Sequence, residues 1–130
     1  MSVYKVVSTS SAPSAIGPYS QAVVHNGIAY SSGSIGFEPS TMQIVEGGVE
    51  AQTRQALKNL KAVVEAAGAS TASVLKTTVF LKDMGDFAKV NTIYEEFFAP
   101  HKPARSAVEV ARLPKDALVE IECIAAVTEA

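Results

Sequence analysis

The sequence is short of several features that define whole classes of protein. It contains one cysteine, Cys123, and no tryptophan among its 130 residues. A single cysteine excludes an intramolecular disulfide and a zinc site built from several thiolates, and it favours a reducing compartment. No stretch approaches the roughly 18 apolar residues of a membrane span, and residues 1–15 lack the apolar run of a signal peptide. We therefore expect a cytoplasmic protein without a membrane partner, and the absence of acidic residues before Glu38 leaves a mitochondrial location open.

An excess of charge of one sign is also missing. Eleven lysines and arginines accompany 13 aspartates and glutamates, which gives a formal net charge of -2. Domains that grip phosphate backbones usually carry a clear basic excess, so the composition argues against nucleic acid as a partner. There are no internal repeats and no low-complexity tracts. With 48% hydrophobic residues, residues 1–130 are expected to form a single domain around one core.

Turn signals and hydrophobic periodicity predict the secondary structure. Asn26-Gly27 separates two apolar runs and predicts an antiparallel hairpin, because both residues tolerate positive φ. Apolar residues at helical spacing predict one helix from Val49 to Ala67, ended by Gly68, and a second over 86–98. Strands are predicted at 3–7, 21–25, 27–32, 74–82, 105–111 and 118–128, with a short one near 43–45. In the strand at 74–82, Leu75, Thr77, Val79 and Leu81 are expected to share a face.

This order of elements predicts an α+β fold, with one β-sheet and two helices packed on one face of it. The last strand has one clean apolar face that suits the helices: Val119, Ile121, Cys123, Ala125 and Val127. Its other face mixes Leu118, Ile124 and Ala126 with Glu120 and Glu122. A monomer would leave this mixed face in water, so we expect it to pack against a neighbouring subunit, with carboxylates where the interface keeps a cleft.

Most motifs of catalysis and cofactor binding are absent from the sequence. It has no phosphate-binding loop, no complete dinucleotide fingerprint, no nucleophile elbow and no pair of histidines at metal-ligand spacing. His25 and His101 stand alone near a turn and a helix end, and we interpret both as solvated loop residues. Cys123 lies on the face expected to meet the helices, so a buried, unreactive thiol is predicted. The pattern supports neither a metal site nor a cofactor.

Charged side chains on the penultimate and last strands are the remaining candidates. Arg105 and Glu109 share one side of their strand, and Glu120 and Glu122 share one side of theirs, so Arg105 is expected to stand beside a glutamate if the strands pair. One interpretation is an ordinary surface ion pair. The other is an arginine that binds a carboxylate through two parallel hydrogen bonds, beside a glutamate that deprotonates water.

Two further residues have both a structural and a functional interpretation. Asn91 interrupts the apolar stripe of the second helix and is either a hydrogen-bonded core amide or a ligand contact. Tyr19 follows Ile16-Gly17-Pro18 and either walls a pocket or covers the edge of the sheet. The residue pattern alone does not identify a substrate.

The same residues carry a specific resemblance to the RidA family, also known as YjgF or L-PSP. Its signature matches Pro103-Ala104-Arg105-Ser106 and continues through Val108-Glu109-Val110 to Val119-Glu120-Ile121-Glu122. The match also covers 16–22, Ser32-Gly33, 63–68 and 76–83, and so spans nearly the whole chain. The resemblance implies a chorismate-mutase-like α+β fold with a mixed sheet. It also implies a homotrimer with a central β-barrel and clefts between adjacent subunits.

The resemblance further implies a cofactor-independent deaminase that hydrolyses 2-imino and 2-enamino acids, such as 2-aminoacrylate and 2-iminobutanoate, to keto acids and ammonia. Such an enzyme would protect pyridoxal-phosphate enzymes from these reactive compounds. Arg105 would bind the substrate carboxylate, and Glu120, expected to be ionised beside a cation, would orient the attacking water. The residues matching the substrate pocket are Tyr19, Ser32, Gly33 and Asn91.

Two positions depart from the pattern of many deaminase members. Ala107 stands where they have a cysteine, and Ser34 stands where they have a glutamine. The volume and polarity of the pocket are therefore open to change. Two other functions remain as alternatives: an endoribonuclease or inhibitor of translation, and a non-catalytic trimer that binds metabolites or acts as a chaperone. The acidic balance of the chain argues against the first of these.

Overall fold

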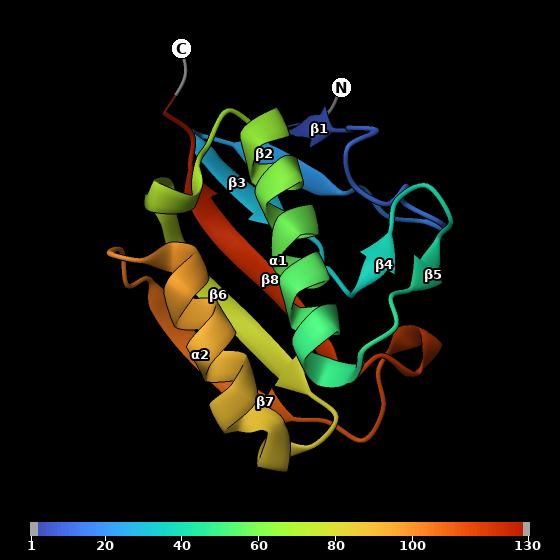
Figure 1. Ribbon diagram of the computed structural model, residues 1–130. Coiled ribbons are helices and arrows are strands. Elements are labelled where there is room, and N and C mark those ends of the chain that lie inside the picture. The colour runs from blue at the N-terminus through green and yellow to red at the C-terminus, as the bar shows by residue number, and fades with distance from the viewer. Residues whose placement is uncertain (1–2, 129–130) are drawn as a thin grey trace.

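The computed structural model describes residues 3–128 (Figure 1). The helices are α1 (Gly48–Ala66) and α2 (Phe87–Phe98). The strands are β1 (Lys5–Val7), β2 (Ala22–His25), β3 (Ile28–Ser31), β4 (Phe37–Glu38), β5 (Gln43–Ile44), β6 (Val74–Leu81), β7 (Ala104–Glu109) and β8 (Val119–Ala126). Single 3-10 turns occur at Thr71–Ser73, Met84–Asp86 and Pro114–Asp116. Both helices and all the predicted strands are confirmed, with boundaries that shift by a few residues.

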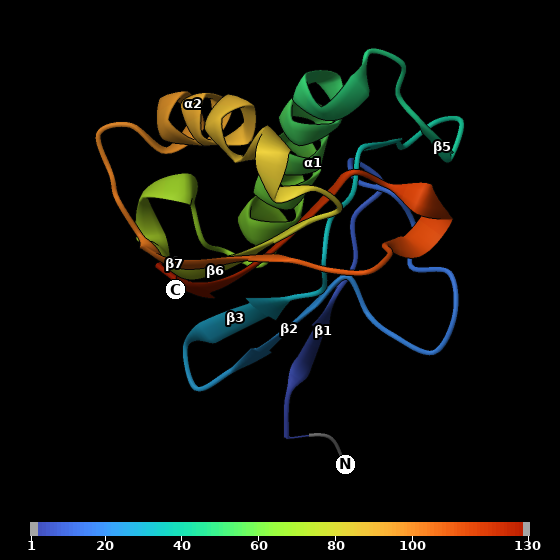
Figure 2. The same ribbon diagram turned by 90° about the horizontal axis from the view of Figure 1, so that it is seen from below.

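One mixed sheet organises the molecule. Its strand order is β1-β2-β3-β8-β6-β7, and every neighbouring pair is antiparallel except β6 and β7, which are parallel and joined through α2. Figure 2 shows α1 and α2 on the same side of the sheet. The predicted α+β architecture, with two helices on one face, is therefore confirmed. None of the helices within residues 3–128 has the length and apolarity needed to cross a membrane.

Local signals in the sequence account for the turns that fix this arrangement. Asn26 and Gly27 both adopt positive φ, 50° and 77°, as a tight hairpin turn requires. Gly68 has φ 88° after the last turn of α1, and its N–H donates to the carbonyl of Glu65 while that of Ala69 donates to Val64. These two bonds form a Schellman motif, which explains why α1 ends where the glycine predicts.

The core lies between the sheet and the two helices. Val119, Ile121 and Ala125 are completely buried, and Cys123 is 3% exposed, so the predicted apolar face is confirmed for these residues of β8. Val127, predicted on the same face, lies after the end of β8 and is half-buried. Leu57 and Leu60 of α1 pack against this face within the same cluster. The opposite face of the sheet carries exposed apolar side chains, among them Val6, Tyr30 and Val108. This is the mixed face that the sequence predicts.

Two local predictions are wrong or incomplete. Leu75 does not share a face with Thr77, because a bulge between Val74 and Lys76 shifts the register against β8. Val74 is buried in its place, and Leu75 is 48% exposed. The strand expected near residues 43–45 exists as β5, but it pairs only with β4 in a separate two-stranded sheet.

Candidate active site

Arg105, near the start of β7, is held by side chains of α2. Its Nη1 donates to Oδ1 of Asn91 at 2.7 Å. Its Cζ lies 4.7 Å from the ring centroid of Tyr94 and 5.3 Å from that of Phe87. Stacking on two aromatic rings and a hydrogen bond to one amide restrict the plane of the guanidinium. We call Arg105, Asn91, Phe87 and Tyr94 the arginine half-site.

The arginine half-site opens onto a surface cavity of about 670 Å³. His101 also lines this cavity and bonds through Nε2 to the carbonyl of Val74 at 2.6 Å. The interpretation of His101 as a solvated loop residue is therefore wrong, because its half-buried ring ties the loop after α2 to β6. Beneath Arg105, Tyr94 bonds to Oγ1 of Thr77 at 2.6 Å, and burial raises the pKa of the tyrosine. The cavity can accept an anion from solvent, because Arg105 is exposed.

Glu120, near the start of β8, lies across Gly33. A Cβ added to Gly33 would stand 2.6 Å from Cδ and 2.8 Å from Cγ of Glu120. Gly33 does not adopt positive φ, so the absence of a side chain is required here for space rather than for backbone conformation. The next residue, Ser34, exchanges two backbone hydrogen bonds with Ile121, at 2.8 and 2.9 Å. Close backbone pairing thus brings the carboxylate against the loop.

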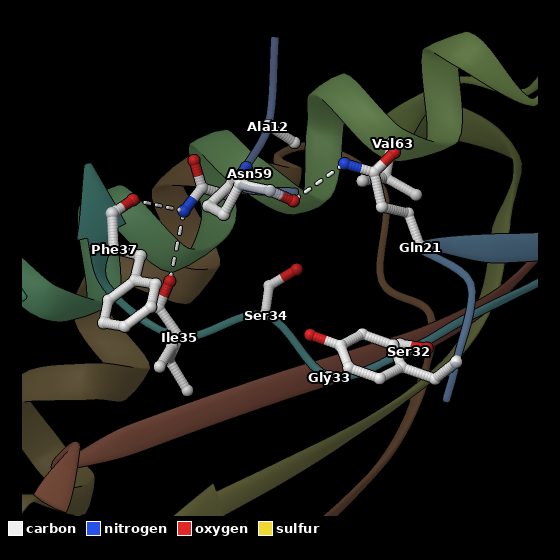
Figure 3. Close-up of a pocket in the computed structure, with 11 residues that line it drawn as sticks. Ala12, Gln21, Ser32, Gly33, Ser34, Ile35, Phe37, Asn59 and Val63 are labelled. Atoms are coloured by element: carbon white, nitrogen blue, oxygen red, sulfur yellow. Dashed lines mark hydrogen bonds between the residues drawn. The ribbon is translucent and has the colours of Figure 1, made fainter. Parts of the chain in front are cut away.

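Tyr19 and Ser32 lie around the same loop. The Ser32 hydroxyl donates to the carbonyl of Ser20 at 2.6 Å, and the backbone N–H of Ile16 donates to the Tyr19 hydroxyl at 3.1 Å. Both residues and Gly33 line a small cavity of about 60 Å³ (Figure 3). Ser34 points its side chain into this cavity as well. We call Glu120, Gly33, Ser32 and Tyr19 the glutamate half-site.

The surroundings of Glu120 favour its neutral form. Burial raises the pKa of the carboxyl, and the negative charge of Glu122 raises it further. The expectation that Glu120 stands beside a cation is wrong within one chain. A carboxylate that is costly to ionise accepts a proton from a bound water more readily, provided that it starts ionised.

The two half-sites lie on opposite faces of the sheet. Strand β6 separates β7 from β8, so the strands that carry Arg105 and Glu120 do not pair, and the condition for placing Arg105 beside a glutamate within one chain is not met. Arg105 is in register with Thr77, which bonds to Tyr94 on the helix side, whereas Glu120 is in register with Phe80 on the other side. A single chain therefore does not bring the two charged residues together.

The other candidate residues are also placed by the structure. Cys123 is buried, and burial raises the pKa of its thiol to about 11, which agrees with an unreactive side chain. His25 is exposed at the hairpin turn, as predicted, and bonds to the carbonyl of Val3. Ala107, two residues after Arg105 on β7, packs against the core. Residues 3–128 present no group of three or more His, Cys, Asp or Glu side chains that could hold a metal ion.

Several residues around the half-sites escaped prediction. Phe87 and Tyr94 were assigned only to the apolar stripe of the second helix, although their rings also support Arg105. Gln21 is buried, and its Nε2 donates to the carbonyls of Thr9 and Pro13. It thereby holds the segment that leads to Tyr19. Buried amides of this kind leave no periodic signal, because a polar residue is expected on the outside.

Comparison with known proteins finds relatives that share most of this chain. The family model described as Endoribonuclease L-PSP matches residues 9–127. A RutC family protein of Pyrococcus horikoshii is 54% identical over 93% of this chain and 96% of its own, and the 2-iminobutanoate/2-iminopropanoate deaminase of Salmonella typhimurium is 53% identical over the same shares. The crystal structure of Escherichia coli TdcF with bound serine superposes with a TM-score of 0.90, at 46% identity over 95% of this chain and 99% of that one. The chain belongs to the RidA family, also called YjgF or L-PSP.

Proposed function

We propose that this protein is a deaminase that hydrolyses small 2-imino and 2-enamino acids to 2-keto acids and ammonia. The observation that carries the proposal is the stacked, exposed guanidinium of Arg105 at the mouth of a cavity. Relatives that are 50 to 53% identical to the chain are named 2-iminobutanoate/2-iminopropanoate deaminase. The bound serine of TdcF supports a small amino-acid-like ligand.

Arg105 would bind the carboxylate of the substrate. Its Nη1 is occupied by Asn91, and the remaining N–H groups of the guanidinium are available to an incoming carboxylate. The rings of Tyr94 and Phe87 would hold the guanidinium plane while the ligand binds. The carbon of the C=N bond would then face the attacking water in one orientation. Imines already hydrolyse in water without a catalyst, so this positioning is most of what the enzyme must supply.

Glu120 would hold the attacking water and accept its proton. The water oxygen adds to the imine carbon, and Glu120 passes the proton that it accepted to the nitrogen. The hydroxyl of the adduct gives up the second proton as the C–N bond breaks and the carbonyl forms, so both protons of the water leave with ammonia. This reaction consumes only water, and the residues proposed for it need no cofactor. Its products are the keto acid and ammonia, and removal of the enamine would protect pyridoxal-phosphate enzymes.

We further propose that the site is completed between subunits of a homotrimer, with its sheets facing inward as a barrel. Arg105 and Glu120 lie on opposite faces of one chain, so a substrate that touches both needs the arginine half-site of one copy and the glutamate half-site of another. The sheet face opposite the helices carries exposed apolar residues, including Val6, Tyr30 and Val108, which support contact with other copies.

An imine-trapping assay tests the activity. An amino-acid oxidase or threonine dehydratase generates the imine, semicarbazide traps what remains, and wild type is compared with Arg105→Ala. We expect wild type to deplete the imine before it is trapped and Arg105→Ala to leave it. If wild-type protein leaves a panel of small imino acids untouched, the proposal is wrong and a binding role for the same cavity becomes the better interpretation.

Mixed oligomers test the shared site. Arg105→Ala and Glu120→Gln subunits are each expected to be inactive alone, and their co-expression should restore up to about a quarter of wild-type activity if arginine and glutamate come from adjacent copies at random. A site made within one chain would remain inactive in every mixture. The matched control is co-expression of Arg105→Ala with Arg105→Lys, where no interface regains both native groups.

A further inference from the structure

Helix α1 has two amide side chains on its buried face. Gln52 is 6% exposed and Asn59 is 2% exposed. They are seven positions apart in the sequence, so they lie two turns apart on the same side of the helix. A buried amide is destabilising unless it is hydrogen-bonded, so the segments that these two amides bind are informative. Asn59 binds the segment that carries Gly33, and Gln52 binds the segment that carries Glu120.

Asn59 holds the loop that continues from Gly33. Its Nδ2 donates to the carbonyl of Ile35 at 3.1 Å and to that of Phe37 at 2.8 Å. Its Oδ1 in turn accepts from Nε2 of Gln55 at 2.9 Å, which fixes the orientation of the amide. Figure 3 shows the two bonds from Asn59 reaching down from α1 to this loop. The loop therefore cannot move from the helix without breaking two hydrogen bonds of a buried amide.

Gln52 holds the start of the strand that carries Glu120. Its Oε1 accepts from the backbone N–H of Leu118 at 2.9 Å, two residues before the glutamate. The loop also lies directly on this residue, because a Cβ added to Gly36 would stand 2.7 Å from Cα of Gln52. One turn of α1 thus touches both the loop and the strand.

The two attachments complete a closed frame. Ser34 and Ile121 join loop and strand by two backbone bonds, Asn59 joins the loop to α1, and Gln52 joins α1 to the strand. We propose that Gln52 and Asn59 are positioning residues that fix where the Glu120 carboxylate lies relative to Gly33. The inference deepens the proposed function, and the role in catalysis rests on that function. The effect of the two amides on the position of Glu120 can be tested without an activity assay.

Substitutions at Gln52 separate positioning from simple support of the fold. Gln52→Met keeps the length of the side chain and removes the acceptor for Leu118, whereas Gln52→Glu keeps an acceptor oxygen in the same place. We expect Gln52→Met to lower kcat by about tenfold to a hundredfold with little change in KM, because Arg105 still binds the carboxylate. Gln52→Glu should recover most of the lost kcat.

Thr53→Val is the matched control. Thr53 is the next residue on α1, is completely buried, and donates only to the carbonyl of Val49 within the helix. This substitution should lower thermal stability without a change in kcat. If Gln52→Met and Thr53→Val reduce kcat in proportion to their loss of stability, or if Gln52→Glu fails to restore kcat, Gln52 only supports the fold and the inference is wrong.

A second measurement keeps the inference separate from the proposed function. The pKa of Glu120 is followed by NMR in protein labelled at the glutamate carboxyl carbon, with Glu120→Gln to assign the signal. We expect the pKa of Glu120 to move in Gln52→Met and in Asn59→Ser, and to stay in Thr53→Val. An unchanged pKa in both amide variants overturns the positioning role, whatever the activity. If the wild-type protein has no deaminase activity but the pKa of Glu120 moves in the amide variants, the frame stands and only the proposed function is overturned.

Discussion

The arginine and glutamate half-sites hold their charged groups in different ways. Arg105 is exposed and is held by side chains alone, two aromatic rings and the amide of Asn91. Glu120 is half-buried and is held through backbone, against Gly33 and beside the bonds between Ser34 and Ile121. The comparison predicts that substitution of Arg105 alters binding without disturbing the fold, whereas substitution at the contact between Gly33 and Glu120 changes activity and stability together.

The largest effect is expected from Gly33→Ala, which tests the coupling at the glutamate half-site. The new Cβ would overlap Glu120, so the carboxylate or the loop must move. We expect activity to fall at least about a hundredfold and the free energy of unfolding to fall by about 1–3 kcal/mol. The imine-trapping assay and chemical denaturation measure the two changes.

Gly85→Ala is the control for this substitution. Gly85 also avoids positive φ, but its added Cβ would meet only the carboxylate of Asp83, an exposed and movable group, at 3.0 Å. Activity should stay at the wild-type level. A Gly33→Ala protein with full activity would contradict the close approach of Glu120.

A smaller loss is expected from Arg105→Lys, which tests the independence of the arginine half-site. Lysine keeps the charge and loses the planar pair of donors. Losing one charge-assisted hydrogen bond of about 1.5–3 kcal/mol should reduce kcat/KM by about tenfold to a hundredfold. The free energy of unfolding should change by less than about 1 kcal/mol, because exposed pairs contribute little. A large drop in the denaturation midpoint would show that substitution at the arginine half-site also lowers stability, as is expected at the glutamate half-site.

A modest and pH-dependent effect is expected from Glu120→Gln. The folded chain holds the Glu120 proton more tightly than the unfolded chain does, so the cost of ionising this group appears as pH rises through the raised pKa and is absent below the unfolded value. Glutamine removes that cost. In the Arg105→Ala background, Glu120→Gln should therefore raise stability at neutral pH and leave it unchanged in acid, as denaturation between pH 4 and 8 will measure.

The wild-type background sharpens the same test. If Arg105 of a second copy approaches Glu120, it lowers the pKa of the carboxyl, and the stabilising effect of glutamine at neutral pH should shrink or reverse. Equal effects of Glu120→Gln in both backgrounds would show that the two groups do not meet.

The smallest effect is expected at Cys123. Its thiol is 3% exposed and its pKa is raised to about 11, so a thiol reagent at pH 8 meets almost no accessible thiolate. Mass spectrometry should show no modification of the native protein and full modification after unfolding. Rapid labelling of the native protein would mean that the sheet under α1 opens far more often than its packing suggests.

The sequence is informative about these regions to different extents. Hairpin and helix ends follow from single residues such as Gly27 and Gly68, and the inward face of β8 follows from strict alternation. The bulge at Leu75 interrupts a similar alternation in β6 and leaves no signal in residue type. Strand order is a long-range property, so the position of β6 between β7 and β8 was not predictable from the residues on either side.

The candidate site shows the same division. The identities of Arg105 and Glu120 as unusual residues follow from charge on otherwise apolar strands, but their placement on opposite faces depends on register. Asn91 was expected to be either a core amide or a ligand contact, and its partner is Arg105. Gln52 and Asn59 were not identified, because a polar residue on a helix is expected to face solvent unless its bonding partner is known.

Tyr94 belongs to the core and to the arginine half-site at once. Its hydroxyl bonds to Thr77 beneath the helix, and its ring lies under the guanidinium of Arg105. Substitutions at this position are therefore subject to two separate selections that one residue must satisfy. Directed evolution for heat resistance alone would accept an aliphatic residue at position 94 if it filled the same space. The resulting variants would lose the aromatic ring under the Arg105 guanidinium, although Arg105 itself was unchanged.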